Sequence, residues 1–197
     1  MYFQREEVKI MDSKTLVTQI PEPPLSRLIF ADTRLSILWV ILRIYVGWAW
    51  LEAGIAKVQN PAWVGPEAGG AIKGFVMGAL AKTGGAHPSV QSWYGDFLNS
   101  FVLSNAQIFS HTVAFGEVLV GIGLILGAFT GIAAFFGAFM NMNFLLAGTV
   151  SINPILLIGQ LFLILAWRVA GWWGLDRFLL PTLGVPWQKG KLFKPKS

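Results

Sequence analysis

The sequence predicts an all-α integral membrane protein, built as a bundle of four transmembrane helices. Of its 197 residues, 54% are hydrophobic and only 13% are charged, whereas a soluble domain of this size carries about 25% charged residues. The chain also contains 9 Trp and 15 Phe, and Trp in particular is enriched where a protein crosses the membrane surface. Much of the surface is therefore expected to face lipid, and the length suits one domain.

The first 33 residues are polar and are predicted to form a cytoplasmic tail. They lack the pattern of a cleavable signal peptide. Pro21, Pro23 and Pro24 are expected to break any helix before the first span, because proline removes a backbone donor. A short helix lying in the membrane interface is the alternative for this segment.

Four apolar segments follow, and each approaches the length of about 20 residues that crosses a bilayer. They cover residues 35–56, 112–129, 132–150 and 154–167. An even number of spans places both termini on the same side. Lys and Arg gather before the first span and after the last one, which predicts that this side is cytoplasmic. The same basic ends suit anionic headgroups, and we expect no nucleic-acid partner.

Residues 57–111 are then expected to form an insert on the outer face. Residues 90–102 repeat apolar side chains at the spacing of an amphipathic helix, and residues 70–83 repeat a weaker version loosened by glycine. Two short helices capping the bundle are predicted, either as an interfacial anchor or as a functional lid. The membrane domain is placed at residues 34–180 and ends in an interfacial helix rich in Trp and Leu. A basic tail follows at 181–197.

The chain has no cysteine and only 2 histidines. This composition excludes disulfides, thiol redox relays, iron–sulfur clusters and Cys-type zinc sites. A haem held by two histidines would need both His87 and His111. We therefore expect no metal or haem, and any redox role must use a diffusible or partner-bound cofactor.

Three ionisable residues lie inside the predicted spans: Arg43 and Glu52 in the first, and Glu117 in the second. Such residues cost about 3 kcal/mol each at the bilayer centre, so they persist where they are paired or used. Counting along the helices places Arg43 near the midplane, level with Asn141 and Gln160. Glu52 and Glu117 fall together in the outer third. These three ionisable residues are the most informative residues of the chain.

Helix rotation separates Arg43 from Glu52, because nine residues amount to about 180° around the axis. Glu52 shares its face with Tyr45 and Trp48, and a groove lined by these three would suit a flat aromatic headgroup.

Structural interpretations stand beside these functional ones. Arg43 would have only a structural role if it bonds to Asn141. Glu117 would have no catalytic role if it is protonated or paired with Arg43. Glu52 and Lys57 would have none either if they reach the outer headgroups. Asn141 and Asn143 are also suited to joining helices within a bilayer.

Several short motifs give the chain a resemblance to the DoxX/DoxD family of small four-helix membrane proteins, and it is more similar to the DoxD side. They are RIYVG at 43–47, GIAK at 54–57, WY at 93–94, GEVLVG at 116–121, GAFTG at 127–131, NMNFLLAG at 141–148, SINP at 151–154 and GLDR at 174–177. The resemblance covers about residues 35–180, and the N-terminal tail lies outside it.

This resemblance implies a protein of the prokaryotic plasma (inner) membrane, similar to the membrane subunit of thiosulfate:quinone oxidoreductase, with quinone as electron acceptor. It also implies a smaller partner subunit, and a homo-oligomer is the other arrangement considered. The alternative function is a non-catalytic accessory or scaffold subunit of a larger complex.

Resemblance and polar depth together assign a role to each candidate residue. Glu117 and Glu52 would deliver protons, and Arg43 would hold a quinone oxygen. The quinone would bind against Tyr45, Trp48, Asn141 and Gln160. Lys57, His87 and His111 would guide thiosulfate.

Overall fold

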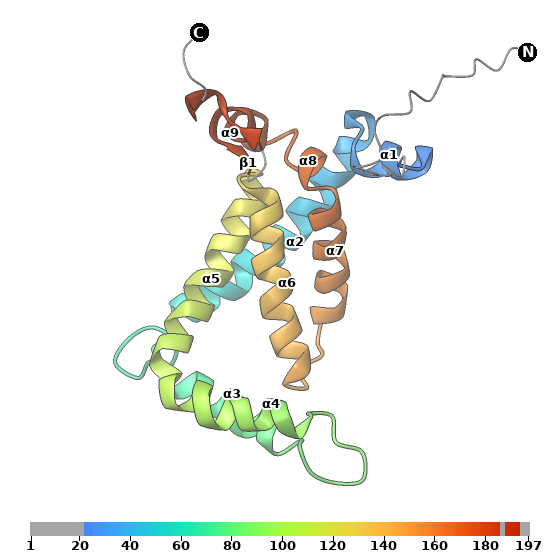
Figure 1. The fold of residues 1–197 in the computed structure, drawn as a ribbon. Coiled ribbons are helices and arrows are strands. Elements are labelled where there is room, and N and C mark those ends of the chain that lie inside the picture. The colour runs from blue at the N-terminus through green and yellow to red at the C-terminus, as the bar shows by residue number, and fades with distance from the viewer. Residues whose placement is uncertain (1–21, 186–187, 194–197) are drawn as a thin grey trace, which may run out of the picture.

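The computed structural model describes residues 22–185 and 188–193, and it is mostly helical. Helices α2, α5, α6 and α7 pack alongside one another, and α3 and α4 lie across one end of them (Figure 1). We call this the insert end, and we call the opposite end, which carries α1, α8 and α9, the terminal end. The main helices are α2 (Ser36–Val58), α5 (Ala106–Leu126), α6 (Thr130–Leu146) and α7 (Asn153–Leu165).

In the part of the chain that the structure describes, two helices are long and apolar enough to cross a membrane. They are the helix containing α2 and a continuous helix of 35 residues, Ser92–Leu126, that ends in α5. Helices α6 and α7 are apolar but shorter, at 17 and 13 residues. A single residue separates α7 from α8 (Trp167–Ala170), which extends it toward the terminal end.

The helix that contains the second predicted span begins before residue 111, where the insert was predicted to end. Helix α4 (Ser92–Phe97) runs through a π-helical turn (Leu98–Val102) and a 3-10 turn (Leu103–Asn105) directly into α5. Between Gly95 and Gly116 the sequence has no glycine or proline, which are the residues that most readily interrupt a helix. His111 consequently lies within α5.

The insert packs its own small core against the end of α6. Val76 of α3 (Gly70–Leu80) and Tyr94 of α4 are buried in a cluster that includes Ala147. Lys82 Nζ donates a hydrogen bond of 2.8 Å to the Gly148 carbonyl in the connection after α6. The two short helices thereby close the insert end of the α5–α6 pair.

At the terminal end, the chain forms a helix where the prolines were expected to prevent one. Helix α1 (Pro24–Phe30) begins at Pro24, because the first turn of a helix needs no backbone donor and suits the fixed φ of proline. Phe30 stacks on Trp39 with ring centroids 5.8 Å apart, which fixes α1 against α2. The rest of the predicted tail, residues 1–21, lies outside the described residues.

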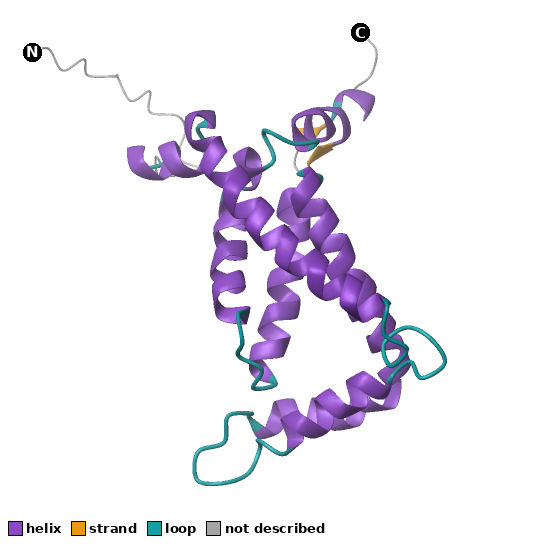
Figure 2. Cartoon of the chain, turned by 180° about the vertical axis from the view of Figure 1, so that it is seen from behind, coloured by secondary structure: helices purple, strands orange, loops and turns teal. Residues whose placement is uncertain are grey.

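Regular structure also continues beyond residue 180, where a basic tail was predicted. Helix α9 (Asp176–Leu183) leads into β1 (Gly184–Val185), which pairs antiparallel with β2 (Gln188–Lys189) (Figure 2). In this register Gly184 lies opposite Lys189, and a 3-10 turn (Lys191–Phe193) follows. Residues 186–187 and 194–197 of the predicted tail lie outside the described residues.

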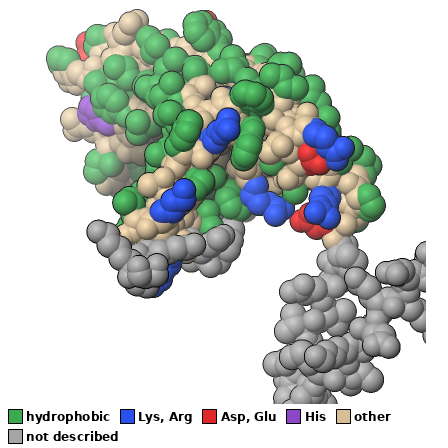
Figure 3. Space-filling model, turned by 90° about the horizontal axis from the view of Figure 1, so that it is seen from above, with side chains coloured by type: hydrophobic (Ala, Val, Ile, Leu, Met, Phe, Trp, Pro, Cys, Tyr) green, Lys and Arg blue, Asp and Glu red, His purple; other side chains and the backbone are tan. Residues whose placement is uncertain are grey.

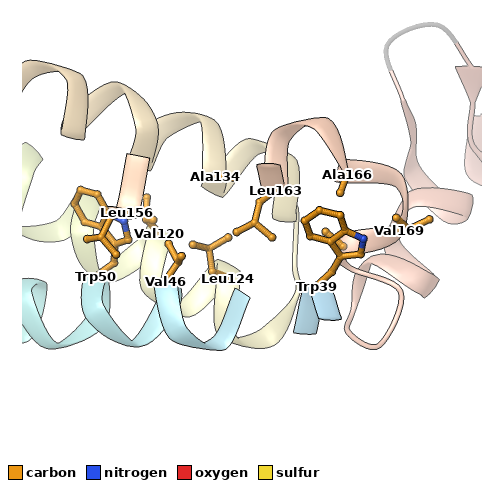
Figure 4. Close-up of a cluster of buried hydrophobic side chains, with 11 residues drawn as sticks. Trp39, Val46, Trp50, Val120, Leu124, Ala134, Leu156, Leu163, Ala166 and Val169 are labelled. Carbon is orange, nitrogen blue, oxygen red and sulfur yellow. The ribbon is translucent and has the colours of Figure 1, made fainter. Parts of the chain in front are cut away.

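Helices α2 and α5 form the most extensive helix–helix contact of the fold. A Cβ added at Gly54 would lie 2.6 Å from the Val118 backbone nitrogen, and one added at Gly121 would lie 2.6 Å from that of Leu51. Glycine therefore lets the two backbones touch. Val46, Leu124 and Leu163 fill the core beside this contact (Figure 4).

The outward faces of the bundle helices are strongly apolar. On α2, α5, α6 and α7 respectively, Ile41, Leu119, Phe139 and Ile158 are each more than half exposed. An apolar surface this extensive is costly in water and is expected only where lipid or another protein covers it.

Candidate functional site

Glu117 forms an ion pair with Lys57 across the α2–α5 interface. Lys57 Nζ lies 2.6 Å from Glu117 Oε2, and the side-chain exposures are 22% for the lysine and 2% for the glutamate. Lys57 also lies over the Trp63 ring, 5.3 Å from its centroid. The partner of Glu117 is thus Lys57 rather than Arg43, and the pair joins the insert end of α2 to the middle of α5.

The pair depends on how closely α2 and α5 approach. Gly54 lies one turn before Lys57, and its missing side chain leaves room for the backbone at Glu117 and Val118. A buried carboxylate with an ammonium partner keeps its charge without stranding it in an apolar interior. Within residues 22–185 and 188–193 it is the only ion pair between two bundle helices.

Tyr45, Trp48 and Glu52 lie on the outward face of α2. All three are exposed, with Trp48 at 62% and Tyr45 at 53%. The structure keeps them together on one face, as the helical spacing predicts. These three residues do not contact Glu117, which pairs with Lys57 in the interface between α2 and α5.

Arg43 lies at the terminal end and not at the level of Asn141, so its predicted depth is wrong. Its guanidinium packs against Gly127, at the C-terminus of α5, and Gly174. Nη2 donates a 3.4 Å hydrogen bond to the Trp173 carbonyl, whereas Nε and Nη1 are buried without a partner. The prediction counted 1.5 Å per residue along the expected span, residues 35–56, whereas in the structure α5 ends beside the second turn of α2, next to Arg43.

Asp176 is a buried carboxylate that sequence reasoning did not single out. It is 4% exposed and accepts hydrogen bonds from the backbone N–H groups of Phe129 (2.6 Å) and Thr130 (2.8 Å) at the start of α6. Its charge also acts on the Arg43 guanidinium. The only sequence signal was its place in the GLDR motif, and the capped helix begins 46 residues earlier.

Asn141 and Gln160 meet in the interface between α6 and α7. Asn141 Nδ2 donates a 2.6 Å hydrogen bond to Gln160 Oε1, and both residues are 0% exposed. Asn141 Oδ1 and Gln160 Nε2 have no partner. The two amides therefore hold each other, and neither faces Arg43.

The two histidines do not meet. His87 is exposed in the connection between α3 and α4. His111 lies on α5, where Nδ1 is 2.9 Å from the Gln107 carbonyl and the ring stacks on Phe115. Within residues 22–185 and 188–193, no cluster of three or more His, Cys, Asp or Glu could hold a metal ion.

A cavity of about 690 Å³ lies between α5 and α6, with α3 and α4 at its insert end. Its lining is largely apolar and aromatic, including Phe109, Phe136 and Phe144. Tyr94 and Asn143 also line it, and the Tyr94 hydroxyl lies 3.0 Å from both the carbonyl and the Oδ1 of Asn143. Sequence reasoning missed this cavity, because periodicity shows which face is apolar but not whether two helices diverge.

Comparison with known proteins identifies the relationship behind this arrangement. The family model described as "TQO small subunit DoxD" matches residues 38–194, which includes all of the helices from α3 onward. The description names DoxD the small subunit, whereas the resemblance led us to expect a smaller partner beside it. No curated protein and no solved structure matches the chain. The chain is a membrane protein, and it belongs to the DoxD family.

Proposed function

We propose that this chain is a membrane subunit of thiosulfate:quinone oxidoreductase, that it crosses the bilayer four times, and that it contributes to quinone reduction. The family description and the apolar outward faces of α2, α5, α6 and α7 support this. At a rise of 1.5 Å per residue, α6 and α7 are roughly 25 and 20 Å long. Helix α8 extends α7 toward the terminal end. Helices this short can span a bilayer that becomes locally thinner around them.

Both termini are proposed to lie in the cytoplasm. Lys and Arg side chains gather on the terminal end, which Figure 3 views from above. The exposed ones are Arg27, Arg34, Arg168, Arg177, Lys189 and Lys191. The positive-inside rule assigns such an end to the cytoplasm and therefore assigns α3 and α4 to the outside.

The buried Lys57–Glu117 pair is the observation that carries the proposed function. Two thiosulfate ions that join through a new S–S bond release two electrons and no protons. A quinone that accepts those two electrons also takes up two protons to become a quinol. An acid–base pair whose lysine is partly exposed and whose carboxylate is buried can pass protons from the insert end into the bundle.

The decisive experiment measures thiosulfate-dependent reduction of a short-chain quinone in membranes that contain the whole complex. We expect Glu117→Gln to lower kcat about 100-fold, the scale of a lost proton-transfer group. Glu67→Gln and Lys73→Gln, which change exposed residues of the insert, serve as matched controls and should keep the wild-type rate.

A charge exchange separates proton transfer from mere packing. Lys57→Glu combined with Glu117→Lys restores an ion pair, and thermal unfolding in detergent should approach that of the wild type. Under the proposed function the rate stays low, because the carboxylate now sits on the wrong helix. A rate restored by the exchange, or a wild-type rate in Glu117→Gln, would contradict a catalytic role.

An accessory role is the second candidate, and the words "small subunit" in the family description favour it. A structural subunit would need the pair only to join α2 and α5. Copurification in mild detergent tests this alternative. An obligatory partner, together with quinone reduction that survives every change at the pair, would make this chain the scaffold.

A further inference from the structure

We infer that the cavity between α5 and α6 is the binding site of the membrane-soluble quinone, which enters sideways from the bilayer and places its ring at the insert end. The inference rests on the proposed function. It replaces the outward face of α2, where the sequence placed the quinone, by a site on the other side of the bundle.

Size and lining fit an amphiphile with a long apolar chain. The volume of about 690 Å³ lies within the range of roughly 300–1,000 Å³ that is typical of small-molecule sites. Phenylalanines line it along most of its length, at Phe109 on α5, Phe136 and Phe139 on α6, and Phe75 on α3. Aromatic and aliphatic walls of this kind stabilise an isoprenoid chain and a flat ring.

The polar groups of the lining gather at one end. Tyr94 belongs to α4, Thr112 to the second turn of α5, and Asn143 to the last turn of α6, so all three lie at the insert end. The single Tyr94 hydroxyl proton faces two acceptors on Asn143, each at 3.0 Å, and can bond fully to only one. This leaves an acceptor for a quinol hydroxyl, while the Thr112 hydroxyl can donate to a quinone carbonyl.

The opening faces lipid. Leu119, Ile132 and Phe139 line the cavity and are also exposed, at 68%, 58% and 60%. They lie on the outward faces of α5 and α6, where the two helices diverge below their connecting turn (Figure 1). A hydrophobic molecule can therefore enter without passing through water.

None of the residues predicted to bind the quinone lines this cavity. Tyr45 and Trp48 are exposed on α2, and Asn141 and Gln160 are fully buried against each other. The proposed proton-handling group is nevertheless close in sequence, because Gly116 lines the cavity and the next residue is Glu117. The cavity and the ion pair thus lie on two sides of the same turn of α5.

A matched pair of glycine substitutions tests the site. Gly116→Leu projects a side chain into the cavity, where its Cβ meets only the flexible Met140 side chain, at 3.4 Å. Gly78→Leu places the same side chain in open space on α3. We expect Gly116→Leu to raise the KM for a short-chain quinone at least tenfold, and Gly78→Leu to leave it unchanged. Thermal unfolding in detergent verifies that both variants fold.

Photolabelling of the purified wild-type complex with an azido-quinone supplies a readout independent of turnover. Labelled peptides should come from α5 and α6, and excess short-chain quinone should suppress the label. Label on the α2 peptide that holds Tyr45 and Trp48 would overturn the inference. Label in the cavity that phospholipid displaces and quinone does not would overturn it as well, because the occupant would then be an acyl chain.

Failure of the inference is distinguishable from failure of the proposed function. If folded wild-type complex neither binds nor reduces quinone, the proposed function is wrong and the inference falls with it. If the wild type does both and folded Gly116→Leu retains the same KM, the function stands and only the cavity assignment is wrong.

Discussion

Helix α5 has two very different sides. Toward α2 it packs through glycine, so that the backbones at Gly54 and Gly121 meet their neighbours almost directly. Toward α6 it presents phenylalanine and leucine and diverges, although the two helices are joined by a tight turn through Gly127 and Phe129. Proximity in the sequence therefore does not decide which helices pack closely. The size of the side chains along the helix–helix interface decides how closely two helices pack.

The two sides of α5 also carry different kinds of polar group. On the tight side, opposite charges neutralise each other at 2.6 Å, between Lys57 and Glu117. On the open side the polar groups are neutral hydroxyl and amide groups at the edge of an apolar space. The tightly packed α2–α5 interface can hold charged groups because their partners are fixed in place. The cavity between α5 and α6 suits neutral groups, which can exchange a partner within the protein for a ligand.

The largest effect is expected on the side of α5 that faces α2, and a methyl group added to each side of the helix tests this. Gly121→Ala would place Cβ 2.7 Å or less from the Leu51 backbone and force α2 away. We expect it to lower the free energy of unfolding by about 3 kcal/mol. Gly116→Ala meets the Met140 sulfur at 3.4 Å and should not lower stability, because Ala favours a helix over Gly by about 1 kcal/mol. Denaturant titration of both variants in detergent measures the difference, and equal losses would refute the contrast.

A smaller loss of stability is expected at the α5–α6 turn, which Asp176 holds through hydrogen bonds. Asp176→Ala removes the carboxylate that accepts hydrogen bonds from Phe129 and Thr130 and that faces Arg43. We expect a loss of about 2 kcal/mol, since hydrogen bonds to charged groups contribute about 1.5–3 kcal/mol. Asp176→Asn keeps one acceptor and should lose less. Amide hydrogen exchange in the first turn of α6 is the measurement, and unchanged protection would disprove the capping role.

The smallest effect is expected at the open end. Tyr94→Phe removes the hydrogen bond between the insert and Asn143 but keeps the ring in its cluster. Hydrogen bonds within membrane proteins average about 0.6 kcal/mol, so the melting temperature in detergent should fall by only a few degrees. A loss as large as that of Asp176→Ala would mean that the insert end is as firmly fastened as the turn.

Much of the fold could be predicted from composition and periodicity, because a lipid-facing helix must be apolar along its whole length. The helical character of residues 36–58 and of the insert followed from these signals. Boundaries were less predictable. The helix from Ser92 to Leu126 has no break, so the insert runs into α5, and Pro24 starts a helix rather than preventing one.

The candidate site was predictable in its residue types and not in its pairings. Arg43 and Glu117 stand out because charge is rare in apolar segments. Their partners are set by where each helix ends and how it is rotated. Lys57 reaches Glu117 because Gly54 brings α2 close, and the charge of Asp176 acts on Arg43 because α9 returns to the start of α6. Contacts over such sequence distances leave no periodic signal.

The amide pair of Asn141 and Gln160 has a consequence for biosynthesis. The two residues are 19 positions apart on successive helices, so the first is made before its partner exists. An amide surrounded by hydrocarbon without a partner costs several kcal/mol. Neither α6 nor α7 is therefore complete as a separate insertion unit. Under the proposed four-span topology, we expect α6 and α7 to enter the membrane together as a helical hairpin joined by this bond.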